Sequence, residues 1–162
     1  MSPAIGTILF TIVFPGTVTV LIPYWLLQSP WNRGFNAQPW IRVPGVALIA
    51  AGVAAYLMCA SAFVRLGRGT PAPWSPPRRL VADGLYVWSR NPMYVAVVLL
   101  VAGEALAFDS VVLLAYSAVC WAGFQAAVLL YEEPKLRRLF GAQYQAYCRA
   151  VPRWLGVGGG GS

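Results

Sequence analysis

The polarity pattern of the chain consists of four long apolar runs separated by shorter polar segments. The runs cover residues 3–27, 44–64, 93–108 and 111–131. A helix rises about 1.5 Å per residue, so about 20 apolar residues cross the hydrocarbon core of a bilayer. The pattern therefore predicts an all-α integral membrane protein with about four transmembrane helices. The third run is short for a complete crossing.

The breaks in this pattern predict two local features. Only Asp109 and Ser110 separate the third run from the fourth, so these runs form a helical hairpin with a tight turn. Pro15 lies inside the first run and predicts a kink, because proline removes a backbone donor and clashes with the preceding turn. The first run lacks a basic start and is too long for a signal peptide, so we expect it to remain in the protein.

After Pro134 the apolar positions return every three or four residues. On a helix, the apolar side chains fall on one arc and the polar ones on the opposite arc. The apolar arc holds Leu136, Leu139, Phe140, Tyr144, Tyr147 and Val151, and the polar arc holds Lys135, Arg138, Gln145 and Arg149. This pattern predicts a cytosolic amphipathic helix that lies on the membrane or caps the bundle, with Pro134 at its first position.

Composition agrees with a membrane protein and indicates its orientation. The chain is 59% hydrophobic and 10% charged. All of its 12 Lys and Arg residues except Arg33 and Arg42 lie around the loop after the second run or in the tail. Loops of membrane proteins that are rich in Lys and Arg stay in the cytosol. We therefore expect this loop, the tail and both termini to be cytosolic. The net charge of +7 then serves orientation and contact with anionic membrane lipids, and we expect no nucleic-acid partner.

The sequence argues against a metal site and a disulfide, and it predicts two segments without regular helix. The chain has no His, and Cys59, Cys120 and Cys148 are widely spaced, so we expect no metal and no disulfide. Residues 67–91 are rich in proline and predict an irregular lid or scaffold at the cytosolic face. Residues 158–162 resemble an engineered Gly/Ser linker, which leaves residues 1–157 as a single transmembrane domain.

Polar residues converge at the open end of the predicted hairpin. Residues equally distant from the turn lie at the same depth, which places Tyr94 level with Gln125 and Glu132 within about one turn of Arg90. A cavity there would combine carboxylates, a guanidinium and hydrogen-bonding side chains. That combination suits a zwitterionic ligand with hydroxyl groups.

Glu104 is expected much deeper in the bilayer, about 18 Å from Pro92 by helix rise. A carboxyl group at that depth is costly unless it is paired or protonated. Two interpretations remain open. Glu104 forms a structural hydrogen bond with Tyr116 or Ser117, or it lines a pocket and contacts the substrate.

Two linked motifs are similar to those of a known family. Asp83–Tyr94 reads DGLYVWSRNPMY and resembles the GPYxxxRHPMYxG motif of the isoprenylcysteine carboxyl methyltransferase and phospholipid methyltransferase superfamily. The tail segments Tyr131–Leu136 (YEEPKL), Phe140–Tyr147 (FGAQYQAY) and Val151–Arg153 (VPR) resemble the ending of the same family. The resemblance covers about residues 66–155.

This resemblance implies a membrane methyltransferase. S-adenosylmethionine would bind at the cytosolic mouth of the hairpin, with S-adenosylhomocysteine as product, and a lipophilic or lipid-linked substrate would enter from the bilayer. By the resemblance, Arg90 and Tyr94 would line the cofactor and reaction site, while Gln125 and Glu104 are candidates from their depth alone. We therefore expect a cofactor site of Arg90, Asn91, Pro92, Tyr94, Gln125, Glu132, Glu133 and Tyr147, and a reaction site of Arg90, Glu104, Arg149 and Arg153. Glu132 and Glu133 would contact the ribose or amino group, and Arg149 or Arg153 would close the pocket.

The chain departs from the family motif at two positions. Asn91 stands where His is frequent in the family. This substitution is compatible with cofactor binding if the position contacts the cofactor through its backbone. Ala96 stands where Gly is common and would narrow the cofactor cleft.

The implied chemistry needs neither a metal nor a nucleophilic side chain. A sulfonium methyl donor already carries a good leaving group, so transfer needs proximity, desolvation and positioned charge. An amine acceptor would have to be deprotonated, by Glu104 or a nearby glutamate, whereas a carboxylate acceptor would need only an arginine to hold it. Two other classes stay open, an NADPH-dependent membrane reductase of related architecture and a noncatalytic membrane protein.

Overall fold

A computed structural model of the chain describes residues 3–36, 39–65, 80 and 82–155. The α-helices are α1 (Pro3–Gly16), α2 (Ile22–Leu27), α3 (Arg42–Arg65), α4 (Pro92–Ala107), α5 (Val111–Ala127) and α6 (Glu133–Ala150). Two π-helical turns, η1 (Thr17–Leu21) and η4 (Val128–Glu132), continue α1 into α2 and α5 into α6. The 3-10 turns η2 (Pro39–Ile41) and η3 (Gly84–Val87) precede α3 and α4.

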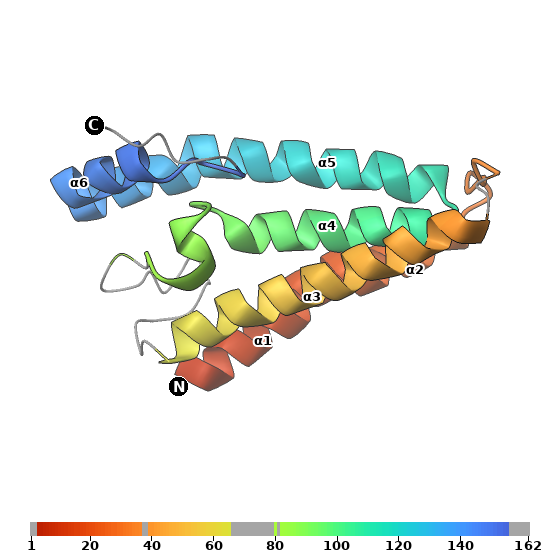
Figure 1. Ribbon diagram of the computed structural model, residues 1–162, viewed down its shortest axis with the longest axis horizontal. Helices are drawn as coiled ribbons and strands as arrows, with labels where there is room; N and C mark the ends of the chain where they lie inside the picture. The colour runs from red at the N-terminus through yellow and green to blue at the C-terminus, as the bar shows by residue number, and fades with distance from the viewer. Residues whose placement is uncertain (1–2, 37–38, 66–79, 81, 156–162) are drawn as a thin grey trace.

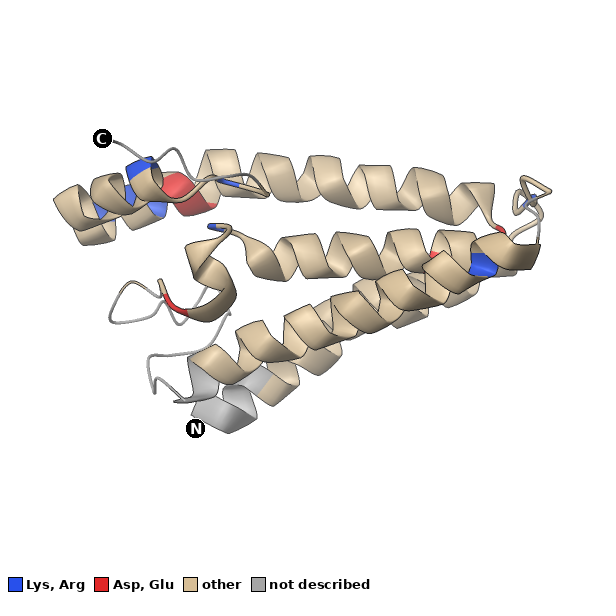
Figure 2. Ribbon diagram, in the orientation of Figure 1, with Lys and Arg blue, Asp and Glu red and all other residues tan. Residues whose placement is uncertain are grey.

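This architecture confirms the all-α membrane fold. Within the described residues, the helical stretches Ile8–Leu27, Pro39–Ala62 and Val111–Ala150 are long and apolar enough to cross a membrane, and Pro92–Ala107 is a shorter apolar helix. The protein is therefore a multi-pass integral membrane protein. Figure 1 shows α4 lying between α5 and the α1–α3 layer. Charged residues gather toward the two ends of the bundle, and long tan stretches of helix separate them (Figure 2).

The α3–α4 pair forms the closest helix contact, and glycine makes it possible. A Cβ atom on Gly52 would lie 2.8 Å from the carbonyl oxygen of Ala96, and one on Gly103 would lie 2.7 Å from the carbonyl oxygen of Gly45. Both distances are shorter than real Cβ contacts, so only glycine permits this backbone approach. Ala96 is fully buried in this contact. The expectation that Ala96 narrows the cofactor cleft is therefore wrong, because its neighbour is α3.

The first membrane helix contains a π-helical turn directly after Pro15. The amide of Ile22 donates to the carbonyl of Thr17, five residues back. The carbonyl of Val18 would then need the amide of residue 23, but Pro23 has none. The Tyr116 hydroxyl from α5 donates to this carbonyl at 3.1 Å. A backbone acceptor inside the bilayer is thus satisfied by another helix, which ties α5 to η1.

The hairpin turn has the predicted location and is locked by the loop after α2. Asp109 adopts a left-handed backbone conformation with φ of 52°. Ser110 caps α5 by accepting from the amide of Leu113, and its hydroxyl donates to Asn32 Oδ1 at 2.6 Å. The amide of Val111 donates to the carbonyl of Arg33 at 3.0 Å. This end of the hairpin, which we call the turn end, is therefore closed by hydrogen bonds to the loop after α2.

The tail is helical as predicted, but it is not one straight helix. Gly141 has φ of 49° and ψ of −122°, which breaks α6 into two parts. A residue with a Cβ avoids this conformation, so glycine allows the reversal. The second part returns toward the bundle, as Figure 1 shows. Tyr144 and Val151 are buried, whereas Leu139 remains exposed. A single apolar arc along the tail is therefore wrong, because Gly141 changes the direction of the helix.

Some of the expected segments lie outside the described residues. They are the proline-rich stretch up to residue 79 and the terminal run 158–162.

Candidate active site at the hairpin mouth

The other end of the hairpin, the hairpin mouth, is where the segment before α4 meets the start of α6 and the chain end. Residues 151–154, which follow α6, form a C-terminal strap over the turn at Ser89–Asn91. The amide of Arg90 donates to the carbonyl of Pro152 at 2.9 Å. Asn91 Nδ2 and Ser89 Oγ both donate to the carbonyl of Arg153, at 3.0 Å and 3.3 Å. Two regions that are 62 to 64 residues apart in sequence are thereby held in contact.

Glu133 is the centre of a buried ion cluster in the hairpin mouth. Its carboxylate accepts from Arg90 Nη1 at 3.1 Å, from Arg153 Nε at 2.6 Å and from Arg153 Nη2 at 3.1 Å. Arg137 Nη2 lies 3.8 Å away. The Glu133 side chain is 6% exposed and that of Arg90 is 11% exposed. Such a cluster holds the guanidinium groups in one geometry at the mouth.

The charges of this cluster set the protonation of Glu133. Burial alone would raise the pKa of its carboxyl, but the hydrogen bond from Arg153 and the charges of Arg90, Arg153 and Arg137 outweigh burial. The pKa of Glu133 therefore lies below its ordinary value. The hydrogen bond to Glu133 in turn raises the pKa of Arg153. The cluster is ionised at neutral pH.

Arg90 has two further features that matter for ligand binding. Its Nη1 atom also donates to Cys148 Sγ at 2.7 Å, which ties it to the second part of α6. Its Nε atom is buried and has no hydrogen-bond partner among the described residues. A buried guanidinium N–H without an acceptor is costly, so this atom is a suitable donor to a bound anionic group.

A second polar pair lies on the hairpin itself. The Tyr94 hydroxyl donates to Glu132 Oε1, and the Tyr94 ring stacks on Phe124 with centroids 4.6 Å apart. The stacking brings Tyr94 to the level of Phe124 and Gln125, as the hairpin register predicts. Glu132 and Glu133 thus have different partners: a neutral phenol binds the first, and guanidinium groups bind the second.

Aromatic residues complete the hairpin mouth. Trp154 Nε1 donates to Gln125 Oε1 at 2.7 Å, and its ring lies 4.4 Å from that of Trp121. The Tyr147 hydroxyl donates to the carbonyl of Tyr86 at 2.7 Å, which connects α6 to η3. The strap and the second part of α6 are therefore fixed to the hairpin by side-chain hydrogen bonds.

Comparison with known protein families shows which family the chain belongs to. Residues 40–143, more than half of the chain, match the family "Phospholipid methyltransferase". The chain belongs to this family. Comparison with curated proteins and with solved structures found no match. The protein is a membrane methyltransferase that uses S-adenosylmethionine as methyl donor and acts on a lipophilic acceptor. The family assignment gives no support to the reductase or to a noncatalytic protein.

The matched region of the phospholipid methyltransferase family contains the first motif and the start of the tail. It ends at residue 143, before the strap. The structure brings nearly all of the expected site residues to the mouth that this region builds. They are Arg90, Asn91, Pro92, Tyr94, Gln125, Glu132, Glu133, Tyr147 and Arg153.

Two expected residues of this methyltransferase lie apart from that group. Arg149 is exposed and makes no ion pair with any residue in the described ranges. Glu104 is half-buried in the last turn of α4, near the turn end, and its Oε2 atom has no hydrogen-bond partner among the described residues. Tyr116 donates to Val18 and Ser117 donates to Leu114. The expected structural hydrogen bond from Tyr116 or Ser117 to Glu104 is therefore wrong, because both hydroxyls satisfy backbone carbonyls instead.

The structure also adds residues to the mouth that the sequence analysis did not assign. Ser89 is buried and binds the strap, Cys148 accepts from Arg90, and Trp154 binds Gln125. Ser89 adjoins Arg90 inside the first motif, which is a usable signal. Cys148 and Trp154 reach the mouth because the chain reverses at Gly141. No local sequence pattern predicts that reversal.

Proposed function

We propose that the chain transfers the methyl group of S-adenosylmethionine to the head-group amine of a membrane phospholipid, and that the cofactor binds at the hairpin mouth. The observation that carries the cofactor site is the buried Nε atom of Arg90, which has no acceptor among the described residues. The methionine part of the cofactor has a carboxylate, which is a fitting acceptor for this N–H. When bound, S-adenosylmethionine supplies a methyl group on a positively charged sulfur.

Each residue of the hairpin mouth has a role in this proposal. Glu133 orients Arg90 and Arg153, and Arg90 holds the carboxylate of the cofactor. Among the described residues, Glu132 accepts its hydrogen bond from the neutral phenol of Tyr94, and in this proposal it attracts the positively charged amino group of the cofactor. Asn91, Pro92, Gln125 and Tyr147 shape the wall and hold the strap and α6 in place. Arg149 closes the pocket from its exposed position on α6.

The acceptor chemistry favours an amine that is removed from water. An amine attacks through its lone pair, so it must be neutral at that moment. Desolvation disfavours a charged ammonium and lowers its pKa. A site that borders lipid and excludes water therefore helps the amine to lose its proton. The family name, phospholipid methyltransferase, supports a phospholipid over a carboxylate-bearing acceptor.

The proposal is tested with purified protein in detergent. Labelled S-adenosylmethionine is supplied with phosphatidylethanolamine, and lipid products are identified by mass spectrometry. We expect mono- and dimethylated head groups. A prenylated cysteine serves as the carboxylate acceptor for comparison, and methyl ester formation without amine methylation would contradict the phospholipid assignment.

We further propose that the hairpin mouth lies on the cytosolic side, with both termini. The positive loop and tail support this orientation. A reporter fused after Trp154 is expected to report a cytosolic location, and a second reporter in the loop at Asn36 the opposite side. Digestion of the tail by protease added to intact cells would contradict this orientation.

A further inference from the structure

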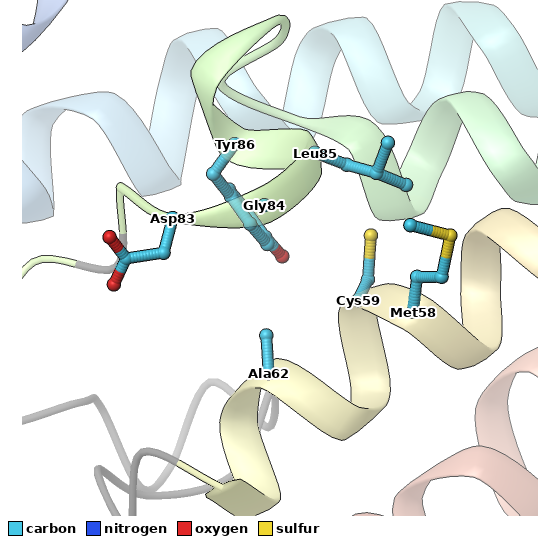
Figure 3. Close-up of a pocket in the computed structure, with 7 residues that line it drawn as sticks. All are labelled: Met58, Cys59, Ala62, Asp83, Gly84, Leu85 and Tyr86. Carbon is cyan, nitrogen blue, oxygen red and sulfur yellow. The ribbon is translucent and has the colours of Figure 1, made fainter.

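A cavity of about 360 Å³ lies between the end of α3 and the turn η3. Met58, Cys59 and Ala62 line it from α3, and Asp83, Gly84, Leu85 and Tyr86 line it from the segment before α4. Figure 3 shows Tyr86 reaching from η3 toward Cys59, with Asp83 at one rim. Its volume is in the range of small-ligand sites. None of its lining residues belongs to the cofactor site proposed above.

Tyr86 connects this cavity with the hairpin mouth. Its side chain lines the cavity, while its carbonyl accepts from Tyr147 at the mouth. Burial raises the pKa of Tyr86, and the charges of Cys59, Tyr147, Glu132 and Tyr94 raise it further. One residue therefore belongs to both the cavity and the hairpin mouth. A group bound in the cavity would be adjacent to the mouth.

The lining of the cavity combines a lipid-compatible wall with one carboxylate. Met58 is 54% exposed on a membrane-spanning helix, so the wall continues onto the outer surface of α3. Leu57 beside it is also exposed. Cys59, Ala62 and Leu85 add small or apolar surface, and Asp83 is the carboxylate among the described lining residues. An occupant would therefore have an apolar part against α3 and a cationic part at Asp83.

We propose that this cavity binds the acceptor phospholipid, with its amine head group at the Asp83 rim and its acyl chains along α3 at Met58. The inference rests on the proposed function and adds the acceptor site to it. The ammonium form is captured by the Asp83 carboxylate. As the head group moves past the apolar wall toward Tyr86, the ammonium releases its proton to water at the exposed Asp83 rim, because leaving water favours the neutral amine. Tyr86 forms the boundary between acceptor and cofactor.

The test separates lipid binding from cofactor binding in the full-length protein. Asp83→Asn removes the carboxylate charge, and Ala62→Phe fills the cavity from α3. Ala118→Phe, at an exposed alanine on α5, is the matched control for the larger side chain. KM for phosphatidylethanolamine in mixed micelles and the affinity for S-adenosylhomocysteine are measured for each variant.

The two cavity variants should change KM for the lipid and leave the affinity for S-adenosylhomocysteine unchanged. Losing a charge-assisted hydrogen bond should raise the lipid KM roughly 10-fold in Asp83→Asn. Ala62→Phe should raise it further, Ala118→Phe should leave it unchanged, and the affinity for S-adenosylhomocysteine should stay at the wild-type value in all three. Free ethanolamine, which has the amine but no acyl chains, should be a poor substrate of the wild type.

Three results would overturn the acceptor site. They are an unchanged lipid KM in both cavity variants, an equal loss of S-adenosylhomocysteine affinity, and methylation of ethanolamine as efficient as that of the lipid. The second would assign the cavity to the cofactor. Failure of the wild type to bind S-adenosylhomocysteine or to methylate phosphatidylethanolamine would instead contradict the proposed function, so the two failures are distinguishable.

Discussion

The two ends of the α4–α5 hairpin are both closed by distant parts of the chain, but by different chemistry. At the turn end, Ser110, Asn32 and Phe35 take part in neutral or single-carboxylate hydrogen bonds between loops. At the hairpin mouth, Glu133 holds two arginines, and one Arg90 N–H keeps no acceptor within the described residues. A closed hydrogen-bond network stabilises a fold. A charged network with an unused donor has capacity for a ligand.

Glu133→Gln is the change expected to cost most stability at the mouth. It removes the charge that Arg90 and Arg153 share, and breaking a buried ion pair costs about 3 kcal/mol here, the lower end of its usual range because Arg153 is partly exposed. Thermal unfolding in detergent measures the effect. The matched control at the turn end is Asp109→Asn, which keeps an acceptor oxygen for the amide of Phe35. An equal loss of stability in the two variants would contradict the proposed difference between the turn end and the hairpin mouth.

The same pair of variants gives a pH test. Because the folded-state pKa of Glu133 is lowered, its stabilisation is complete above the unfolded value of 4.5 and is lost as pH falls through the folded value. The wild type should therefore lose stability on acidification below 4.5 more steeply than Glu133→Gln. Parallel curves would show that Glu133 does not titrate as proposed.

Arg90→Ala should reduce the affinity for S-adenosylhomocysteine at least about 100-fold, because it removes the donor proposed for the cofactor carboxylate and frees Glu133. Arg33→Ala is the control at the turn end, where the Arg33 backbone carbonyl, which the substitution keeps, accepts from the amide of Val111. Isothermal titration of both variants measures the difference. Wild-type affinity in Arg90→Ala would disprove the cofactor site.

Ser110→Ala probes the turn end alone. It removes the cap of α5 and the hydrogen bond to Asn32, and loss of such a cap costs about 1 kcal/mol. We expect a lower melting temperature with unchanged affinity for S-adenosylhomocysteine. A loss of cofactor affinity would show that the two ends are coupled through the helices.

Glu104→Gln is expected to have the smallest effect. Glu104 lies in the last turn of α4, away from the hairpin mouth, and the Tyr116 and Ser117 hydroxyls donate to backbone carbonyls instead. An amide keeps an acceptor and avoids a charge in the hydrocarbon, so activity and melting temperature should stay near wild type. A fall in turnover by about 10² with unchanged cofactor affinity would instead identify Glu104 as a base for the amine.

Most of the mouth was predictable because its residues lie in short motifs next to a hairpin of known register. Arg90, Tyr94 and Glu132 follow from motif and depth alone. Cys148 and Trp154 did not, since their positions depend on the reversal at Gly141. Glycine at that position permits a reversal, but glycine also occurs within ordinary helices, as Gly103 does in α4. Local sequence cannot decide between the two.

The sequence by itself determined the four apolar runs, the turn at Asp109 and Ser110, and the placement of charged residues toward the ends of the bundle, because bilayer thickness and helix rise convert run lengths directly into structure. Only the tertiary structure decided which partner each polar group takes. Adjacent glutamates bind a phenol and two guanidiniums, Tyr116 satisfies the carbonyl that Pro23 leaves without a donor, and Ala96 packs on Gly52. These outcomes depend on helix rotation and close packing between distant segments, which a one-dimensional pattern does not specify.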